Sequence, residues 1–328
     1  MAYAREKQVA VEAVRLASEL CRTVRADMVA VGSLAKDDKS PVTVADFGSQ
    51  ALVCQHLQMA FAGDSIVGEE DSSDLRKPGA QQEATLAKVV EFVRRFRPEA
   101  AAETVCAWID AGNGKVGRRF WTLDPIDGTK GFLRNDQYAV ALALVEDGQV
   151  KVGVLGCPAL ALDMNDPNSP TGVIFAAVRG EGAAMASMDG DRFTPIRVAS
   201  TADRSRLRFV ESVEADHGDP SLQEAVARAV GIAAPPLRMD SQVKYGAIAR
   251  GDAALYLRLP SPKSPDYREK IWDHAAGALI VQEAGGRVTD MHGKPLDLSS
   301  HYKMRDNRGV IASQGTLHDA AVSALSRS

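Results

Sequence analysis

The sequence has few of the features that mark secreted, membrane-bound or nucleic-acid-binding proteins. Only four of its 328 residues are cysteine, and none stands in a CxxC pair, so neither a disulfide framework nor a zinc site is indicated. No apolar run approaches the ~18 residues of a membrane span, and the charged N-terminus lacks the apolar core of a signal peptide. The formal net charge of -4 argues against a general nucleic-acid binder, which carries a basic face. We therefore expect a cytoplasmic protein with reduced thiols that binds neither membranes nor nucleic acids.

The composition is that of an ordinary globular protein. Hydrophobic residues make up 45% of the chain and charged residues 25%, so we expect a sizeable core and no extended disorder. The chain contains no internal repeat and no low-complexity tract. Its length suits one large domain or two ordinary ones.

The first part of the chain combines helices with antiparallel strands. Apolar periodicity predicts helices at residues 5–30, after Thr43 and at residues 83–97. Short apolar runs, which are typical of strands, follow at residues 120–124, 138–145, 150–155, 173–178 and 183–188. The dipeptide Asp147-Gly148 between two of these runs predicts a tight hairpin.

The second part alternates strands and helices, which is typical of an α/β unit. Strand-like runs occupy residues 208–213, 254–259, 287–289 and 310–312. Helices are predicted to begin at Asp219-Pro220, at Ser241 as the capping residue, and at Trp272 or Asp273. We predict an N-terminal α+β domain at residues 1–195 and a C-terminal α/β domain at residues 196–328.

Carboxylates are concentrated in four short segments. These segments contain Asp46, the pair Glu69-Glu70, the motif from Asp124 to Asp127, and Asp273. In the third segment a strand ends at Asp124, and Pro125 cannot donate a hydrogen bond to a neighbouring strand. Asp127 can then face the same cavity, and two carboxylates forced together repel unless a cation bridges them.

This arrangement favours a hard cation beside a phosphate site. Oxygen-only ligands select Mg²⁺ or Mn²⁺ over zinc. The free amides at Gly128-Thr129, where a new turn begins, are suited to hold a phosphate group.

Each acidic segment also has a simple structural explanation. A lone DPxDG motif is usually two turns, Glu69-Glu70 alone is typical of a solvated surface, and Asp273 alone suits a helix N-cap. Asp46 could form a capping box with Thr43. The combination of all four in one chain favours a functional site.

Three motifs in a fixed order resemble a known enzyme superfamily. They are GEE at 68–70, DPIDGT at 124–129 and WDHAAG at 272–277. This set resembles the lithium-sensitive, Mg²⁺-dependent phosphatases that include inositol monophosphatase and fructose-1,6-bisphosphatase. The closer resemblance is to the 3′(2′),5′-bisphosphate nucleotidases, and it rests on SPVTVADFGSQ at 40–50, LDPIDGTKGFLRNDQYAVALAL at 123–144, SVEADH at 212–217, DSQVKYGAIARGDA at 240–253, YLRLP at 256–260 and EKIWDHAAGALIVQEAGG at 269–286.

The resemblance implies a fold, an activity and a cofactor. The fold would be the layered α/β/α/β/α arrangement of the sugar phosphatases. The enzyme would remove the 3′-phosphate of adenosine 3′,5′-bisphosphate to give AMP, and it would also act on the sulfated nucleotide. It would use two or three Mg²⁺ ions, with Mn²⁺ as a substitute, and lithium would inhibit it. We expect a monomer whose partner is a small nucleotide.

The resemblance also implies roles for particular residues. The metal ions would be held by Glu69, Asp124, Asp127, Asp273 and the carbonyl of Ile126, with Glu70 in support. Asp46 and Thr129 would pair to orient and deprotonate the attacking water. The substrate would be held by Gly128, Thr129, Ser241, Lys244, Arg258, His217 and Asp273.

Two other functions fit parts of this pattern. An inositol phosphatase would share the metal site but need no base-binding pocket. A non-catalytic nucleotide sensor would keep the pocket without the complete acidic set, and the intact set argues against it. On spacing alone, Lys244 and Arg258 could be ordinary solvated charges, whereas their places in SQVKY and YLRLP favour a binding role.

Overall fold

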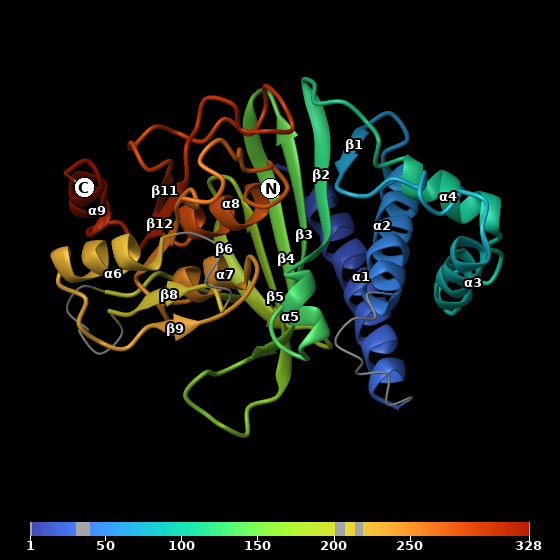
Figure 1. The fold of residues 1–328 in the computed structure, drawn as a ribbon, viewed down its shortest axis with the longest axis horizontal. Coiled ribbons are helices and arrows are strands. Elements are labelled where there is room, and N and C mark those ends of the chain that lie inside the picture. The colour runs from blue at the N-terminus through green and yellow to red at the C-terminus, as the bar shows by residue number, and fades with distance from the viewer. Residues whose placement is uncertain (1, 31–39, 201–206, 214–218, 328) are drawn as a thin grey trace.

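The computed structural model describes residues 2–30, 40–200, 207–213 and 219–327, which form alternating layers of helices and sheets. A seven-stranded sheet has a pair of long helices on one face and two buried helices on the other. A five-stranded sheet follows, and two further helices cover its outer side (Figure 1). The layered α/β/α/β/α fold expected from the sequence is confirmed.

Two long helices, α1 (Ala4–Ala30) and α2 (Ser40–Ala60), cover the large sheet. Helix α1 buries one side at a spacing of three and four residues, through Ala10, Ala13, Val14, Ala17, Leu20, Cys21 and Val24. Helices α3 (Ala80–Arg94) and α4 (Ala102–Asp110) pack on the outer side of α2 (Figure 1). Helix α3 begins and ends three residues before the predicted helix at 83–97.

The large sheet has its strands in sequence order. They are β1 (Ser65–Gly68), β2 (Arg119–Asp127), β3 (Ala139–Glu146), β4 (Gln149–Ala161), β5 (Thr171–Val178), β6 (Gly182–Ser187) and β7 (Thr194–Pro195). All neighbours are antiparallel except β1 and β2, which run parallel. The predicted hairpin at Asp147-Gly148 is present, and both residues have the positive φ angles, 50° and 75°, that a tight turn of this kind requires.

The small sheet has the order β11-β12-β10-β8-β9. Its strands are β8 (Phe209–Glu211), β9 (Leu237–Arg238), β10 (Leu255–Arg258), β11 (Arg287–Thr289) and β12 (Val310–Ser313). Helices α6 (Pro220–Ala229) and α9 (His318–Leu325) contact each other on its outer side. The strands of the large sheet end at Pro195 and those of the small sheet begin at Phe209, while a domain boundary at residue 195 stays a prediction.

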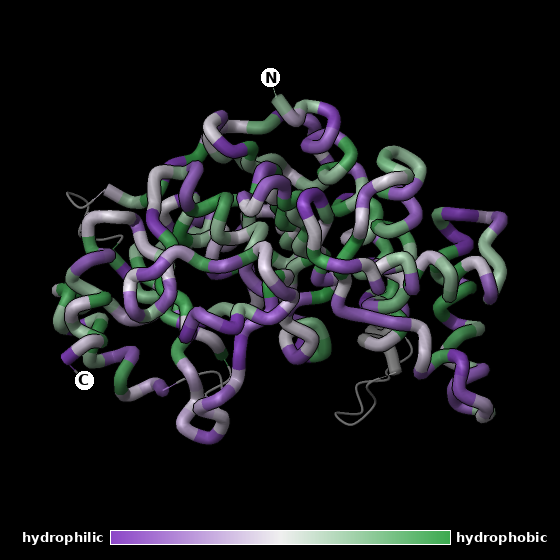
Figure 2. The backbone as a smooth tube through the Cα atoms, turned by 90° about the horizontal axis from the view of Figure 1, so that it is seen from above, coloured by the Kyte–Doolittle hydropathy of each residue, from purple (hydrophilic) through white to green (hydrophobic). Residues whose placement is uncertain are grey.

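Helices α7 (Val243–Ala249) and α8 (Ala275–Glu283) lie between the two sheets. Helix α8 contacts strands of both sheets, and its residues 275–281 are all buried. A Cβ atom on Gly277 would collide with the ring of Tyr245, so the glycine permits α7 and α8 to approach closely. Figure 2 shows hydrophobic and hydrophilic stretches alternating along the chain, with many hydrophobic stretches in the interior of the molecule. None of the helices in the described ranges is long and apolar enough to cross a membrane.

Two helix starts differ from those predicted. Helix α8 begins at Ala275 rather than at Trp272 or Asp273, and its N-cap residue His274 makes no capping bond with its side chain. The amide of Gly277 instead donates to Oε1 of Gln242 (3.2 Å), so a residue of another element caps the helix. Helix α7 begins at Val243 with Gln242 as its N-cap, one residue after the predicted capping position of Ser241.

Candidate active site

One cavity of about 300 Å³ between the two sheets brings together most of the predicted site residues. From the predicted set, its lining includes Glu69, Asp124, Ile126, Asp127, Gly128, Thr129, Ser241, Lys244, Arg258 and Asp273. Segments that are far apart in the sequence therefore contribute acidic side chains and basic side chains to one cavity.

A bulge in β2 explains how two aspartates three residues apart reach the same cavity. Asp124 pairs with Ala141 and Asp127 pairs with Ala139, so β2 has one more residue than β3 between these pairs. In a regular strand, residues three apart point to opposite faces, and an extra residue reverses this relation. The hydroxyl of Ser49 donates to the carbonyl oxygen of Pro125 (3.0 Å) at the bulge.

The parallel pairing of β1 with β2 brings Glu69 to the same edge. Gly68 is paired with Leu123, so the next residues along the two strands are Glu69 and Asp124. The amide group of Gln50 from α2 fixes this turn: the backbone N–H of Glu70 donates to its Oε1 (3.1 Å) and its Nε2 donates to the Glu70 carbonyl. The side chain of Gln50 thus supports the segment that presents Glu69.

Burial and mutual repulsion raise the pKa values of the acidic cluster. The pKa of Asp124 is well above its usual range because the side chain is buried and because Glu69, Asp127 and Asp273 lie nearby. The pKa of Glu69 is raised to about 7, first because the surrounding protein displaces water from the carboxylate and then because Glu70 and Asp127 repel its charge. The side chain nevertheless keeps an accessible surface. Burial is also the largest cause that raises the pKa of Asp273 to about 7. Such a cluster is suited to a cation that neutralises it.

A buried oxygen of Asp124 supports the same conclusion. Its Oδ1 atom is inaccessible to solvent and has no hydrogen-bond partner among the described residues. A buried carboxylate oxygen without a hydrogen-bond partner destabilises the folded state, so its presence indicates a site that binds a ligand. Carboxylate oxygens are the ligands that Mg²⁺ prefers, and the chemistry of this set of residues therefore fits magnesium.

Asp127 links the cluster to the other side of the cavity. The backbone N–H of Gln242 donates to Oδ2 of Asp127 (2.6 Å). Burial raises the pKa of Asp127, whereas the positive charge of Lys244 and this hydrogen bond act to lower it. Lys244 is buried, and burial lowers its pKa to about 8 although Asp127 acts in the opposite direction. Its Nζ donates to the carbonyl of Met239 (3.2 Å) and lies 5.3 Å from the ring centre of Tyr256.

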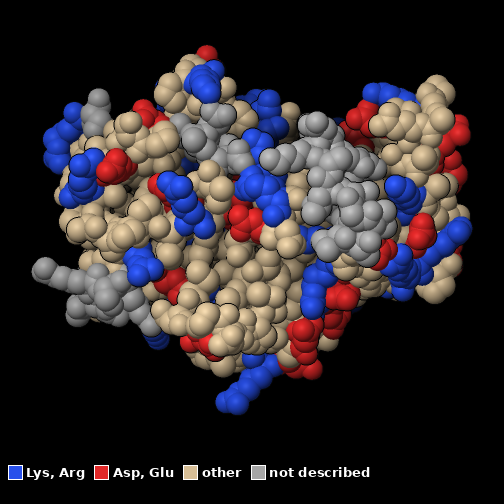
Figure 3. All heavy atoms as spheres, turned by 60° about the horizontal axis from the view of Figure 1, so that its bottom comes forward, with Lys and Arg blue, Asp and Glu red and all other residues tan. Residues whose placement is uncertain are grey.

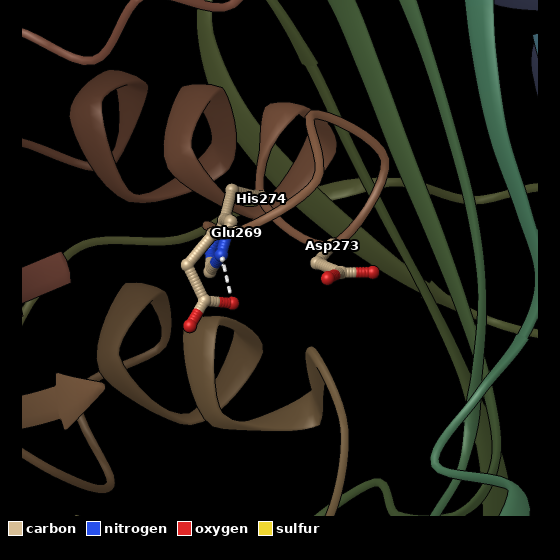
Figure 4. A group of neighbouring side chains, drawn as sticks. All are labelled: Glu269, Asp273 and His274. Carbon is tan, nitrogen blue, oxygen red and sulfur yellow. Dashed lines mark hydrogen bonds and ion pairs between the residues drawn. The ribbon is translucent and has the colours of Figure 1, made fainter. Parts of the chain in front are cut away.

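Glu269, Asp273 and His274 form a group whose atoms lie close enough for a metal site. Figure 4 shows Glu269 and His274 facing each other, with Asp273 directed away from both. His274 contacts Glu269 through Nε2 (3.1 Å) and the hydroxyl of Tyr245 through Nδ1 (2.7 Å). Both ring nitrogens of His274 are thus engaged, whereas Asp273 interacts electrostatically with Asp127 and Glu69 of the acidic cluster.

Gly128 has a backbone conformation and surroundings that favour glycine. Its φ of 90° lies in the left-handed region, and a Cβ atom there would approach the Cβ of Ser241 to 2.8 Å. The short helix α5 (Thr129–Leu133) begins immediately afterwards. Ser241 also has a positive φ, 62°, and its hydroxyl accepts from the amide of Val243 (3.2 Å).

Asp46, His217 and the supporting residue Glu70 are the predicted site residues that are not part of the cavity lining. Asp46 is buried in α2, and its pKa is raised well above the usual range by burial and then by Glu70 and Glu69, which places it near the acidic cluster. No hydrogen bond joins Asp46 to Thr129 within the described part of the chain, and the predicted pairing stays a prediction. His217 lies outside the described residues.

Several residues of the cavity were missed by sequence reasoning. They are Lys130, Gly131, Asp240, Gln242, Tyr245, Tyr256, Glu269 and His274. Asp240 contacts the Nη2 atom of Arg134, and Gln242 joins α7 to α8 through bonds to Trp272 and Gly277. Their signal was their position: Asp240 and Gln242 flank Ser241, and Glu269 and His274 flank the segment that contains Asp273.

Comparison with known proteins identifies the family. A model of the inositol monophosphatase family matches residues 4–328. The chain belongs to the inositol monophosphatase family. This confirms the resemblance seen in the motifs, and enzymes of this family are generally Mg²⁺-dependent.

Relatives within the family carry a more specific name. The 3′(2′),5′-bisphosphate nucleotidase of Schizosaccharomyces pombe is 44% identical, over 99% of this chain and 96% of that protein. The nucleotidase of the same name from Dictyostelium discoideum is 39% identical, over 99% of this chain and 97% of that protein. These two proteins match the chain over nearly the full length of both partners.

Solved structures of the family share the fold. CysQ from Bacteroides thetaiotaomicron has a TM-score of 0.62 and 21% identity, covering 95% of this chain and 98% of that chain. An inositol monophosphatase from Anabaena has a TM-score of 0.60 and 21% identity, covering 100% and 97%. At this identity the likeness shows the family fold and no particular substrate.

Proposed function

We propose that the chain is a 3′(2′),5′-bisphosphate nucleotidase, which hydrolyses adenosine 3′,5′-bisphosphate to AMP and phosphate. The observation that carries the proposal is that one cavity contains both the acidic cluster and the basic residues Lys244 and Arg258. The acidic cluster is suited to bind a metal ion beside the reacting phosphate, and the two basic residues are suited to bind a further anionic group of the same substrate. The names of the relatives support the same activity.

The acidic residues are proposed to hold the cofactor. Magnesium would be held by Glu69, Asp124, Asp127, Asp273 and the carbonyl oxygen of Ile126. When bound there, the ions would neutralise the charge of the phosphoryl group and make water more acidic. The number of ions, two or three, and replacement by Mn²⁺ are part of the proposal.

The reaction breaks the bond between phosphorus and the ribose 3′-oxygen. Water supplies the oxygen that the phosphate gains and the proton that the 3′-oxygen takes up. Asp46 and Thr129 are proposed to orient this water and accept its proton, and the amides of Gly128 and Thr129 to hold the phosphate. The Gln242 amide holds Asp127 in place throughout, because it donates to a carboxylate oxygen at 2.6 Å.

The other end of the substrate is proposed to lie against the later part of the chain. Lys244 and Arg258 would hold the 5′-phosphate, and Ser241 and His217 would contact the nucleoside. The sulfated nucleotide presents the same 3′-phosphate, so we propose it as a second substrate. An inositol phosphatase needs no second anionic subsite, so Lys244 and Arg258 favour the nucleotidase over this alternative. A non-catalytic sensor needs no acidic cluster with an unsatisfied buried oxygen, so the cluster favours an enzyme over a sensor.

Two further features belong to the proposal. All four cysteines are unpaired and buried, which is consistent with a reducing compartment, and we propose a cytoplasmic location. We also propose that the enzyme acts as a monomer.

A substrate panel tests the proposal. Phosphate release is measured with magnesium from adenosine 3′,5′-bisphosphate, 3′-phosphoadenylyl sulfate, 3′-AMP, 5′-AMP and inositol phosphates. We expect the highest kcat/KM for the two nucleotides that carry a 3′-phosphate and a second anionic group. Preference for inositol phosphates would favour the alternative enzyme, and no turnover of any compound would favour the sensor.

A further inference from the structure

Glu269 connects Arg258 on strand β10 to His274 at the start of helix α8 in the wall of the cavity. Its Oε1 atom accepts from Nε of Arg258 (3.2 Å), and its Oε2 atom contacts Nε2 of His274 (3.1 Å). The hydroxyl of Tyr245 closes the chain of contacts at Nδ1 of His274 (2.7 Å). Glu269, His274 and Tyr245 are only 7%, 2% and 1% exposed, so they form a nearly dry support behind Arg258.

The protonation of this chain follows from its contacts. A carboxylate can only accept, so His274 must donate through Nε2, and its Nδ1 is then free to accept from the Tyr245 hydroxyl. Although burial opposes ionisation, Arg258 and His274 lower the pKa of Glu269 to about 2. The negative charge of Glu269 in turn raises the pKa of Arg258 above its usual range, against the effect of burial. Both shifts favour the charged form of this ion pair.

This geometry leaves part of Arg258 available to a ligand. Glu269 engages Nε, and among the described residues it is the only ion-pair partner of Arg258. The guanidinium lines the cavity, and its side chain is 23% exposed. A guanidinium held at Nε can present its two terminal nitrogens side by side, which is the geometry that binds a phosphate in a bidentate manner.

Glu269 also separates Arg258 from competing carboxylates. Asp273 and Asp127 are both close enough to interact electrostatically with Arg258. Without its own carboxylate partner, the guanidinium would be drawn towards these residues. A local partner for Arg258 therefore keeps the basic group directed at substrate and the acidic cluster open for cations.

We propose that Glu269 is a positioning residue that determines the preference of this site for a substrate with two anionic groups. It acts through Arg258, and His274 and Tyr245 hold it in place. The inference rests on the proposed function, because it assigns Arg258 to the phosphate that does not react. The proposal assigns Glu269, which is 7% exposed, no direct contact with the substrate.

A pair of substrates that differ in one phosphate tests the proposal. Values of kcat and KM are measured at saturating magnesium for adenosine 3′,5′-bisphosphate and for 3′-AMP, with wild type, Glu269→Gln, Arg258→Ala and the double variant. In Glu269→Gln we expect the KM for the bisphosphate to rise about tenfold or more, which corresponds to at least ~1.4 kcal/mol of binding. Its kcat, and both constants for 3′-AMP, should stay within roughly threefold of wild type. The double variant should be no worse than Arg258→Ala, because the two residues act in series.

Asp252→Asn is the matched control. Asp252 is the carboxylate partner of Arg250, another largely buried ion pair, but neither residue lines the cavity. This variant should leave the KM for both substrates unchanged. If Glu269→Gln does not fold, as judged by circular dichroism, Glu269→Asp is measured in its place, since it keeps the charge but shortens the reach to Arg258.

The outcomes separate this inference from the proposed function. Equal losses on both substrates, an unchanged KM for the bisphosphate, or additive effects in the double variant would each contradict a positioning role for Glu269. Wild-type protein that is active on inositol phosphates but releases no phosphate from adenosine 3′,5′-bisphosphate would instead contradict the proposed function.

Discussion

Asp124 shows at the scale of one residue that the cavity is organised for binding rather than for stability. Its Oδ1 atom is buried without a hydrogen-bond partner among the described residues, and the neighbouring carboxylates raise its pKa further. A buried polar atom left unsatisfied costs roughly 1–3 kcal/mol in the folded state. The folded chain carries this cost at the position where a cation would remove it.

The first prediction concerns Asp127. Asp127→Asn keeps the size of the side chain and the bond from the Gln242 amide, but it removes a charge that the metal requires. We expect kcat/KM to fall by at least ~10²-fold, within the range that metal catalysis supplies. The Tm without magnesium should not fall, because one repelling charge is lost. The control is Asp191→Asn, at a side chain that is 97% exposed, and near-normal activity of folded Asp127→Asn would remove Asp127 from the site.

Gly128 provides a second prediction at this scale. Gly128→Ala would combine an unfavourable φ of 90° with a Cβ approach of 2.8 Å to Ser241. Gly180→Ala is matched to it, because Gly180 has a φ of 81° but no atom near the added Cβ. We expect Gly128→Ala to lower the free energy of unfolding by at least ~1 kcal/mol more than Gly180→Ala does. Urea denaturation of the two variants measures the difference, and equal losses would show that the contact with Ser241 is easily relieved.

Residue types and motif spacing could predict the acidic residues but not the support behind them. Asp124 and Asp127 were predicted to face one cavity because the strand was expected to end at Asp124. This expected end is wrong: β2 continues to Asp127, and a bulge between the two residues turns both towards the cavity. Glu269 and His274 stand close to Asp273 in the sequence, but no residue pattern signals that His274 also contacts Tyr245, because that contact depends on the packing of α8 against α7. The explanation of Asp273 as an N-cap is wrong, because Gln242 supplies the cap from outside the helix.

At the scale of elements, one buried histidine at the start of α9 joins two strands of the small sheet, beside the hydrophobic contacts that the helix makes with this sheet. Nε2 of His318 contacts the hydroxyl of Thr289 on β11 (2.8 Å), and Nδ1 contacts the hydroxyl of Ser313 on β12 (3.0 Å). Thr289 already donates to the carbonyl of Asp290, so it accepts from Nε2, and Nδ1 accepts from Ser313. The neutral imidazole satisfies both strands, and burial lowers the pKa of His318 from 6.5 to about 4.

This pKa shift predicts a pH dependence of stability. The contribution of His318 is fully present above pH 6.5 and is lost as the pH falls towards 4, because the unfolded chain takes up the proton first. From pH 7.5 to pH 5, its share of the loss in free energy of unfolding should be about 2 kcal/mol. Urea denaturation at both pH values should show a smaller pH dependence in His318→Gln, and an unchanged one in His292→Gln, at an exposed histidine. An undiminished dependence in His318→Gln would contradict this assignment.

The elements that the sequence could predict are those with local signals. The hairpin at Asp147-Gly148 follows from its turn residues, and α6 begins at Asp219-Pro220, where the Asp219 side chain accepts from the amide of Leu222 (3.1 Å). The parallel pairing of β1 with β2 and the two-residue strand β9 have no comparable signal. They depend on contacts between distant segments, which local propensity does not describe.

At the scale of the whole molecule, the layers bring the substrate-binding residues together. The large sheet delivers Glu69, Asp124 and Asp127 at one edge, while Asp273 and Lys244 come from the helical layer beside it. Figure 3 shows basic and acidic side chains interspersed on the face that it displays. Recognition of an anionic substrate is therefore a property of the cavity and not of an extended surface of one charge on this face.

Magnesium should stabilise the entire fold through this arrangement. Because the proposed ligands lie on both sides of the cavity, an ion that binds only the folded chain raises the free energy of unfolding by mass action. We expect the wild-type Tm to rise by a few degrees on addition of magnesium at constant ionic strength and to return with EDTA. The shift should be much smaller in Asp127→Asn. Equal shifts in the two proteins would place the stabilising ion elsewhere.

We propose above all that this site removes the 3′-phosphate of a nucleoside 3′,5′-bisphosphate. The most direct test is to identify the nucleotide product from adenosine 3′,5′-bisphosphate by chromatography while phosphate release is measured in the same sample. We expect 5′-AMP and phosphate in equal amounts, with no 3′-AMP and a strict requirement for a divalent cation. Formation of 3′-AMP, or unchanged turnover in the presence of EDTA, would contradict the proposal.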